Sequence, residues 1–165
     1  MTQSLIPAEV AARVGEEVVR RSATVQTQDF QRFAAAVGDR NPLYFDPEYA
    51  RTQGYRDVVM PPLFLPQIHL GVIDLTQLRA DGTAGGGNGN LSFPDAPRRM
   101  AAGEDHTFLA PVYGGDVVTQ VRTIDSIVQK QGRSGAFVLV TWATTYTNQD
   151  GQLVARSTSS MIARP

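Results

Sequence analysis

The sequence has no cysteine, no long apolar run and no surplus of charge of either sign. Without cysteine there can be no disulfide, no thiolate nucleophile and no cysteine-ligated metal. The 15 Lys and Arg residues against 16 Asp and Glu give a formal net charge of -1, which argues against nucleic acid as a partner. No apolar run approaches the ~18 residues of a membrane-spanning helix, so no membrane association is expected.

The N-terminus lacks the basic start and apolar core of a signal peptide, so the predicted location is cytoplasmic. A chain of 165 residues fits a single domain over residues 1–165. Asp46, Glu48 and Asp57 do not have the spacing of a metal site. We therefore expect neither a metal nor a cofactor.

The first strongly patterned segment is a predicted helix that leads into a polar loop. Phe30, Phe33, Ala34 and Val37 follow one another at i, i+3, i+4 and i+7, which is typical of one buried helix face. Gly38 then supplies the left-handed cap with which many helices end. The residues that follow should therefore leave the helix as a loop.

The most apolar part of the chain lies between residues 58 and 75 and contains three prolines, Pro61, Pro62 and Pro66. Prolines at these positions disfavour a strand, so we predict a helix that starts near Pro61 or Pro62 and runs to Leu70 or beyond. A helix that is apolar nearly all round belongs in the middle of a structure. Residues 79–100 are rich in glycine and proline and indicate a loop insertion.

Strand-forming residues dominate the last third of the chain. Runs rich in β-branched and aromatic residues predict strands at about 105–109, 117–128, 136–147 and 152–163, in addition to a first strand at 17–26. Helices followed by such a meander are typical of the α+β class. The expected architecture is an antiparallel sheet wrapped around the long apolar helix.

The polar loop carries a family resemblance. Gly38, Asp39, Asn41, Pro42 and the residues up to Ala50 resemble the hydratase motif of MaoC-like proteins, which have the hotdog fold. That motif reads Gly-Asp-x-Asn-Pro-aliphatic-His and then, after five further residues, a small residue, here Ala50. The stretches at 55–64 and 108–116 are similar to the family's entry into the central helix and to its next strand and turn, so the resemblance covers residues 14 to 164.

The resemblance implies an (R)-specific 2-enoyl-thioester hydratase, or a 3-hydroxyacyl-thioester dehydratase in reverse. In the family, the aspartate and the histidine of the motif hold the reacting water and exchange its protons. Asp39 matches the aspartate, and Asn41 with Pro42 matches the pair that shapes the loop. The histidine position, however, is occupied by Tyr44.

This departure matters because hydration needs groups that exchange protons near neutral pH. Histidine, with a pKa of about 6.5, does so, whereas a phenol with a pKa of about 10 is a poor base. The two histidines of the chain, His69 and His106, lie elsewhere; we expect His69 to be packed and hydrogen-bonded inside the apolar helix. A structural alternative for the loop is a helix cap followed by an Asx turn, with Tyr44 as a packing residue.

The variant from Gly38 to Ala50 looks like the N-terminal-type MaoC dehydratase domain, the non-catalytic half of paired hotdog enzymes. It implies a partner hotdog that carries the complete Asp/His pair, with the two sheets joined edge to edge. Two alternatives remain open. One is a self-sufficient homodimer or larger homo-oligomer in which Asp39 works with Tyr44 or His106; the other is a non-enzymatic hotdog that binds an acyl thioester.

The substrate would be an acyl-CoA or an acyl-carrier-protein thioester. The predicted substrate-binding residues are Asn41 in the loop, Pro62 at the start of the central helix, and Arg98 and Arg99 after the insertion. Arginine forks suit the phosphate oxygens of CoA or of a carrier protein, although solvated surface arginines are the alternative.

Overall fold

The computed structural model describes residues 4–70, 75–78 and 91–165. Its strands are β1 (Glu17–Thr24), β2 (Arg98–Phe108), β3 (Val117–Gly132), β4 (Gly135–Thr147) and β5 (Leu153–Arg164). Its α-helices are α1 (Ala8–Ala11), α2 (Thr27–Ala36) and α3 (Pro47–Thr52), and its 3-10 helices are η1 (Pro42–Tyr44), η2 (Pro62–His69) and η3 (Leu75–Gln77). Within these described residues no helix is long and apolar enough to cross a membrane.

The strands form one five-stranded antiparallel sheet in the order β1-β3-β4-β5-β2. Four of them match the predicted strands to within a few residues at each end. β2 begins at Arg98, earlier than the predicted start at Asp105, so its first residues belong to the sheet and not to the insertion. Its sequence is poor in β-branched residues, and pairing with β5 supplies what local propensity does not.

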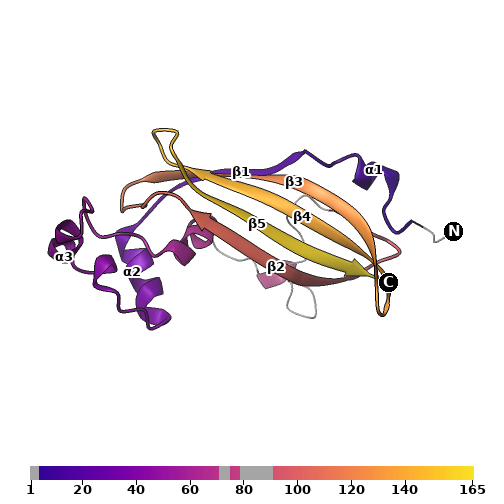
Figure 1. Cartoon of the computed structure of the whole chain (residues 1–165), viewed down its shortest axis with the longest axis horizontal. Coiled ribbons are helices and arrows are strands. Elements are labelled where there is room, and N and C mark those ends of the chain that lie inside the picture. The colour runs from indigo at the N-terminus through magenta and orange to yellow at the C-terminus, as the bar shows by residue number, and fades with distance from the viewer. Residues whose placement is uncertain (1–3, 71–74, 79–90) are drawn as a thin grey trace.

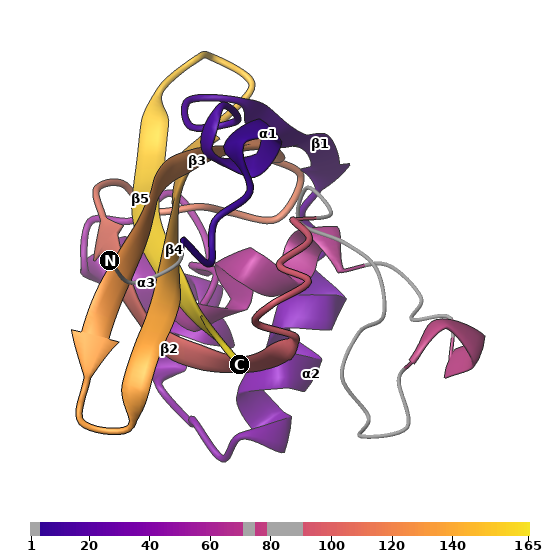
Figure 2. The same ribbon diagram turned by 90° about the vertical axis from the view of Figure 1, so that its right-hand side faces the viewer.

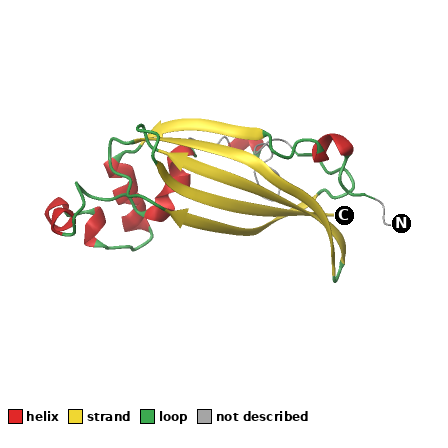
Figure 3. Ribbon diagram, turned by 45° about the horizontal axis from the view of Figure 1, so that its top comes forward, coloured by secondary structure: helices red, strands yellow, loops and turns green. Residues whose placement is uncertain are grey.

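Most of the helical segments lie at one end of this sheet, around α2, α3 and η2 (Figure 1, Figure 3). Phe30 of α2 and Leu65 of η2 pack with Val118 of β3 and Tyr146 of β4 in a buried cluster. Phe30 is fully buried, as the helical spacing predicts, but Val37 is 61% exposed. The helix ends at Ala36, so Val37 has already left the face that continues Phe30 and Ala34.

A second apolar cluster covers the other end of the same face of the sheet. Here Val10 of α1 and the segment from Leu91 to Ala96 pack against strand residues such as Ile124 and Trp142. The described end of the insertion, residues 91–97, is therefore partly core, because Leu91, Phe93 and Ala96 are all buried. The earlier part of the predicted insertion, residues 79–90, falls outside the described residues.

The central helix begins at Pro62, as predicted, and Leu70 is its C-cap. Pro66 lies within its eight residues, and the predicted continuation beyond Leu70 falls at residues 71–74, outside the described part. Leu65 and His69 face inward, whereas Leu63 and Leu70 are 62% and 54% exposed. The curved sheet holds its helices against one face (Figure 2). The chain has the α+β hotdog fold.

Candidate active site

The polar loop leaves α2 through a left-handed turn at Gly38. The φ angle of Gly38 is 75°, a region that side chains with a Cβ rarely adopt. The backbone N–H of Asp39 then donates to the carbonyl of Ala34 over 2.9 Å. Glycine at this position therefore closes the helix and directs Asp39 away from it, as the sequence predicts.

Asp39 and Asn41 shape the loop through side-chain hydrogen bonds to its backbone. Oδ1 of Asp39 accepts from the N–H of Asn41 over 3.1 Å, and Oδ1 of Asn41 accepts from the N–H of Leu43, also over 3.1 Å. The second bond caps the short helix η1, which starts at Pro42. Asp39 is exposed, so its carboxylate can still reach a water or a ligand.

Tyr44 lies at the end of η1 and is only 8% exposed. Its backbone carbonyl accepts from Nε2 of Gln31 over 2.9 Å, which holds the loop against α2. Burial raises the pKa of the Tyr44 phenol, the negative charge of Asp39 raises it further, and a hydrogen bond with Asn41 acts in the opposite direction. The phenol therefore stays protonated near neutral pH and cannot act as a general base there.

The end of the motif is a second capped helix. Oδ1 of Asp46 accepts from the N–H groups of Glu48 and Tyr49, over 2.9 and 3.0 Å, and Pro47 occupies the first helical position. Both features are typical of the start of a helix. Ala50 is fully buried, which gives a physical reason for a small residue at the last position of the motif.

Pro62 opens the central helix and lines an apolar groove of about 270 Å³. Tyr55, Met60 and Leu65 lie on the same side, and Phe108 and Leu109, at the end of β2, form the opposite wall. Phe108 is 40% and Leu109 51% exposed, although both are apolar. The groove thus combines the start of the central helix with the end of an edge strand.

Arg98 and Arg99 lie at the start of β2, at the opposite end of the sheet from α2 and the Asp39 loop (Figure 1). Both guanidinium groups donate to backbone carbonyls of the chain. Arg98 donates to Pro165, over 2.7 Å from Nε, and Arg99 donates to Leu91. The structure does not bring these arginines together with Asp39, Tyr44 or Pro62.

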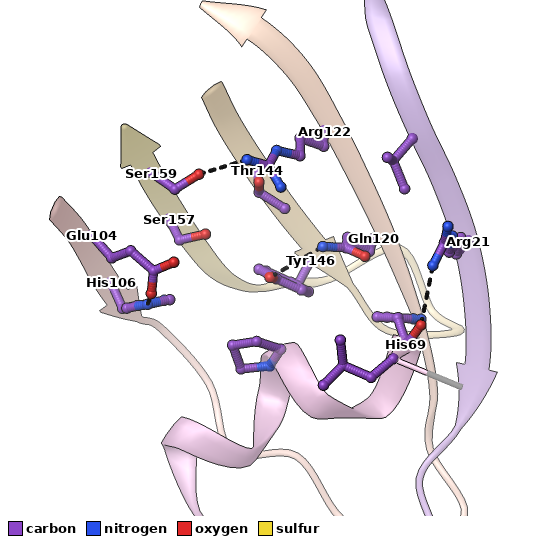
Figure 4. A pocket seen from close by; sticks show the side chains of 13 residues that line it. Arg21, His69, Glu104, His106, Gln120, Arg122, Thr144, Tyr146, Ser157 and Ser159 are labelled. Atoms are coloured by element: carbon purple, nitrogen blue, oxygen red, sulfur yellow. Dashed lines mark hydrogen bonds and ion pairs between the residues drawn. The ribbon is translucent and has the colours of Figure 1, made fainter. Parts of the chain in front are cut away.

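His69 and His106 line a different cavity, of about 280 Å³, on the helix-bearing face of the sheet (Figure 4). Neither Asp39 nor Tyr44 lines it. His69 is buried, as predicted, but the described residues offer no hydrogen-bond partner to either ring nitrogen. His106 lies 3.5 Å from Glu104, measured from Nε2 to Oε2.

No sequence motif marks the strand residues of this cavity, among them Arg122, Tyr146 and Ser157. A signal was present in the alternation of β3, where Gln120 and Arg122 occupy inward-facing positions between the buried residues Val118 and Ile124. Among the described residues no group of His, Asp or Glu could hold a metal ion.

The burial of His69 predicts a pH dependence of stability. Burial, together with the nearby positive charge of Arg21, lowers the pKa of His69 from its ordinary value. Below about pH 6.5 the unfolded chain then binds a proton that the folded chain does not, so the free energy of unfolding is expected to fall as the pH falls through that range. Urea unfolding on either side of this pH checks it; His69→Gln should flatten the dependence, whereas a fall unchanged in that variant would contradict it.

Comparison with known proteins agrees with this geometry. Residues 12–157 match the family described as FAS1-like, dehydratase domain region. A UPF0336 protein of Parafrankia sp. (strain EAN1pec) is 32% identical over 157 residues, which are 92% of this chain and 95% of that protein.

Solved structures with the same fold include the ChsH1-ChsH2 complex from Mycobacterium tuberculosis, at a TM-score of 0.70 and 19% identity over 94% of this chain and 86% of that one. A MaoC-like dehydratase from Rhodospirillum rubrum has a TM-score of 0.62 and 22% identity over 92% of each chain. The chain shares its fold with MaoC-like dehydratases, and it belongs to the FAS1-like dehydratase domain family and to the UPF0336 proteins.

Proposed function

We propose that this chain is one subunit of a 2-enoyl-thioester hydratase or 3-hydroxyacyl-thioester dehydratase and that it works with a second hotdog carrying the complete Asp/His pair. The observation that carries the proposal is the state of Tyr44. The loop keeps Asp39, Asn41 and Pro42, yet the position of the proton-exchanging residue holds a buried phenol with a raised pKa. Half of the acid–base pair is therefore supplied from elsewhere.

The outer edge of β2 supports a partner that adds to the sheet. Within the described residues β2 pairs on one side only, with β5, and all of its residues except His106 are exposed. An edge strand of this length presents a row of unpaired N–H and C=O groups, which a second strand can satisfy. The exposed apolar side chains Phe108, Leu109 and Leu63 lie next to that edge and to the start of η2.

The groove beside Pro62 supports an acyl thioester as the ligand. Its lining is predominantly apolar, as an acyl chain requires, and it ends at Pro62, the first residue of the central helix. The ChsH1-ChsH2 complex, which contains a chain of this fold, is a complex of two named components. In our proposal the chain shapes the acyl site, Asn41 holds the loop, and the partner carries out the proton transfers.

Assays of the chain alone and mixed with a partner hotdog test the proposed function. The purified chain alone is expected to give no hydration of a 2-enoyl-CoA above background. Together with a MaoC-like hotdog that carries the full motif ending in histidine, it should give at least about a hundredfold more turnover than either protein alone. The reaction is monitored by the absorbance of the enoyl thioester.

The variant Asp39→Ala separates the alternatives. Activity of the mixture that survives this substitution supports the partner arrangement. Robust turnover by the lone chain that Asp39→Ala abolishes would instead establish a self-sufficient enzyme. Tight binding of the enoyl-CoA without turnover in any mixture would favour a binding module.

A further inference from the structure

The cavity that holds His69 and His106 is a polar band between the two apolar clusters of the sheet. Arg122, Thr144, Ser157 and His106 are register partners on β3, β4, β5 and β2, so they form one row across four strands. One cluster, with Tyr146, lies on one side of this row, and the other, with Trp142, lies on the other side. Packing alone would favour apolar residues in such a row.

Arg122 is one of two arginines that line the cavity; the other, Arg21, donates to the backbone carbonyl of His69 over 3.2 Å (Figure 4). One of the terminal nitrogens of Arg122 donates to Oγ of Ser159 over 2.8 Å, and its guanidinium carbon lies 4.6 Å from the centre of the Trp142 ring. Its Nε is buried and has no hydrogen-bond partner among the described residues. A buried N–H of a cation without an acceptor is costly unless a bound group satisfies it.

His69 is a second buried group without a partner. It is 8% exposed, lines the cavity from η2 and stacks near Tyr146, with ring centroids 6.5 Å apart. Among the residues that the structure describes, none bonds to either of its ring nitrogens. Two unsatisfied polar side chains, from opposite walls, therefore face one cavity.

We infer that this cavity is a binding site for a small organic monocarboxylate. Arginine binds a carboxylate through two parallel N–H groups, and Arg122 lines this cavity with an Nε that has no acceptor among the described residues. The hydroxyls of Thr144, Ser157 and Tyr146 supply further polar contacts in the same cavity. The site is distinct from the Asp39 loop and goes beyond the proposed function.

Size and charge narrow the ligand to one compact anion. A volume of about 280 Å³ is at the lower limit of ordinary ligand pockets. Glu104 also lines the cavity, so a second negative charge on the ligand would meet a carboxylate. Arg21 and Arg122 bring two positive charges to the lining and Glu104 one negative charge, so a single carboxylate on a short carbon chain balances the site.

Butyrate tests the inference, with the fluorescence of Trp142 as the signal. Trp142 is the sole tryptophan of the chain and stacks with Arg122, so a carboxylate on the guanidinium should change its emission. Sodium butyrate is expected to give a saturable change and to raise the midpoint of thermal unfolding. Butyramide, its uncharged counterpart, should give neither. No saturable response to butyrate, an equal response to butyramide, or tighter binding of inorganic phosphate would overturn the inference.

Two substitutions should act in opposite directions. Arg122→Gln removes the guanidinium and is expected to weaken butyrate binding at least about tenfold. Glu104→Gln removes a like charge from a side chain that is 67% exposed, so this variant should fold normally and bind butyrate more tightly. Arg32→Gln, on the exposed surface of α2, should leave the affinity unchanged. Weaker binding by Glu104→Gln, or an Arg122→Gln variant that folds and binds as the original does, would contradict the site.

Discussion

Tyr44→His is expected to restore turnover to a complex whose catalytic partner has been inactivated by removal of its own motif histidine. The expected gain is about 10²- to 10⁴-fold over the inactive complex, the usual contribution of a well-placed general acid–base group. The physical reason lies in the loop, where Asp39, Asn41 and Pro42 already have the hydratase pattern and only the group that exchanges protons near neutral pH is missing. The gain is measured as the rate at which the reconstituted complex hydrates a 2-enoyl-CoA.

The position of Tyr44 in the loop suits its substitution by histidine. Burial raises the pKa of the Tyr44 phenol and the charge of Asp39 raises it further, so a side chain at position 44 is subject to the electrostatic influence of that carboxylate. Histidine is smaller than tyrosine, so it enters the buried position without overpacking. An imidazole with a pKa near 6.5 can then accept and return a proton during turnover.

Two controls define the result. Tyr44→Phe should leave the inactive complex inactive, because it removes the hydroxyl without adding a base. The double variant Asp39→Asn with Tyr44→His should return to background, because the pair is again incomplete. A folded, assembled Tyr44→His complex with no gain in rate would show that the loop no longer has catalytic geometry.

Phe108→Glu is expected to weaken association with the partner hotdog by about 30-fold or more, which corresponds to the loss of one hot-spot residue. Phe108 is the last residue of the edge strand β2, is 40% exposed and lines the groove beside Pro62. A carboxylate there would lose its hydration against the strand that the partner adds at this edge. Because the side chain is already partly in solvent, the lone subunit should keep its fold. Calorimetric titration of one subunit with the other measures the change.

Val14→Glu is the matched control. Val14 is also an exposed apolar residue, at 47%, but it follows α1, far from the end of β2 where Phe108 lies (Figure 1). The same charge at Val14 should leave the association constant within about twofold, since surface substitutions outside an interface have small effects. Equal weakening by both variants, or none by Phe108→Glu, would exclude the β2 edge as the interface.

Local sequence features predicted the elements that depend on local physics. The cap at Gly38 and the strands β3, β4 and β5 follow from helix capping and β-propensity, and the structure has all of them. The early start of β2 could not be read in this way. Residues Arg98 to Gly103 have little strand preference, and within the described part of the chain their strand partner is β5.

The candidate site likewise has features that local sequence predicts and features that depend on distant contacts. The sequence by itself determined the fold class, the loop motif and the absence of its histidine, because these are properties of residue type and spacing. Only the tertiary structure decided that Tyr44 is buried, that Arg98 and Arg99 bond to carbonyls away from the loop, and that both histidines share a cavity with Arg122. Burial and cross-strand register depend on which distant segments meet, and a linear pattern carries that information only in part.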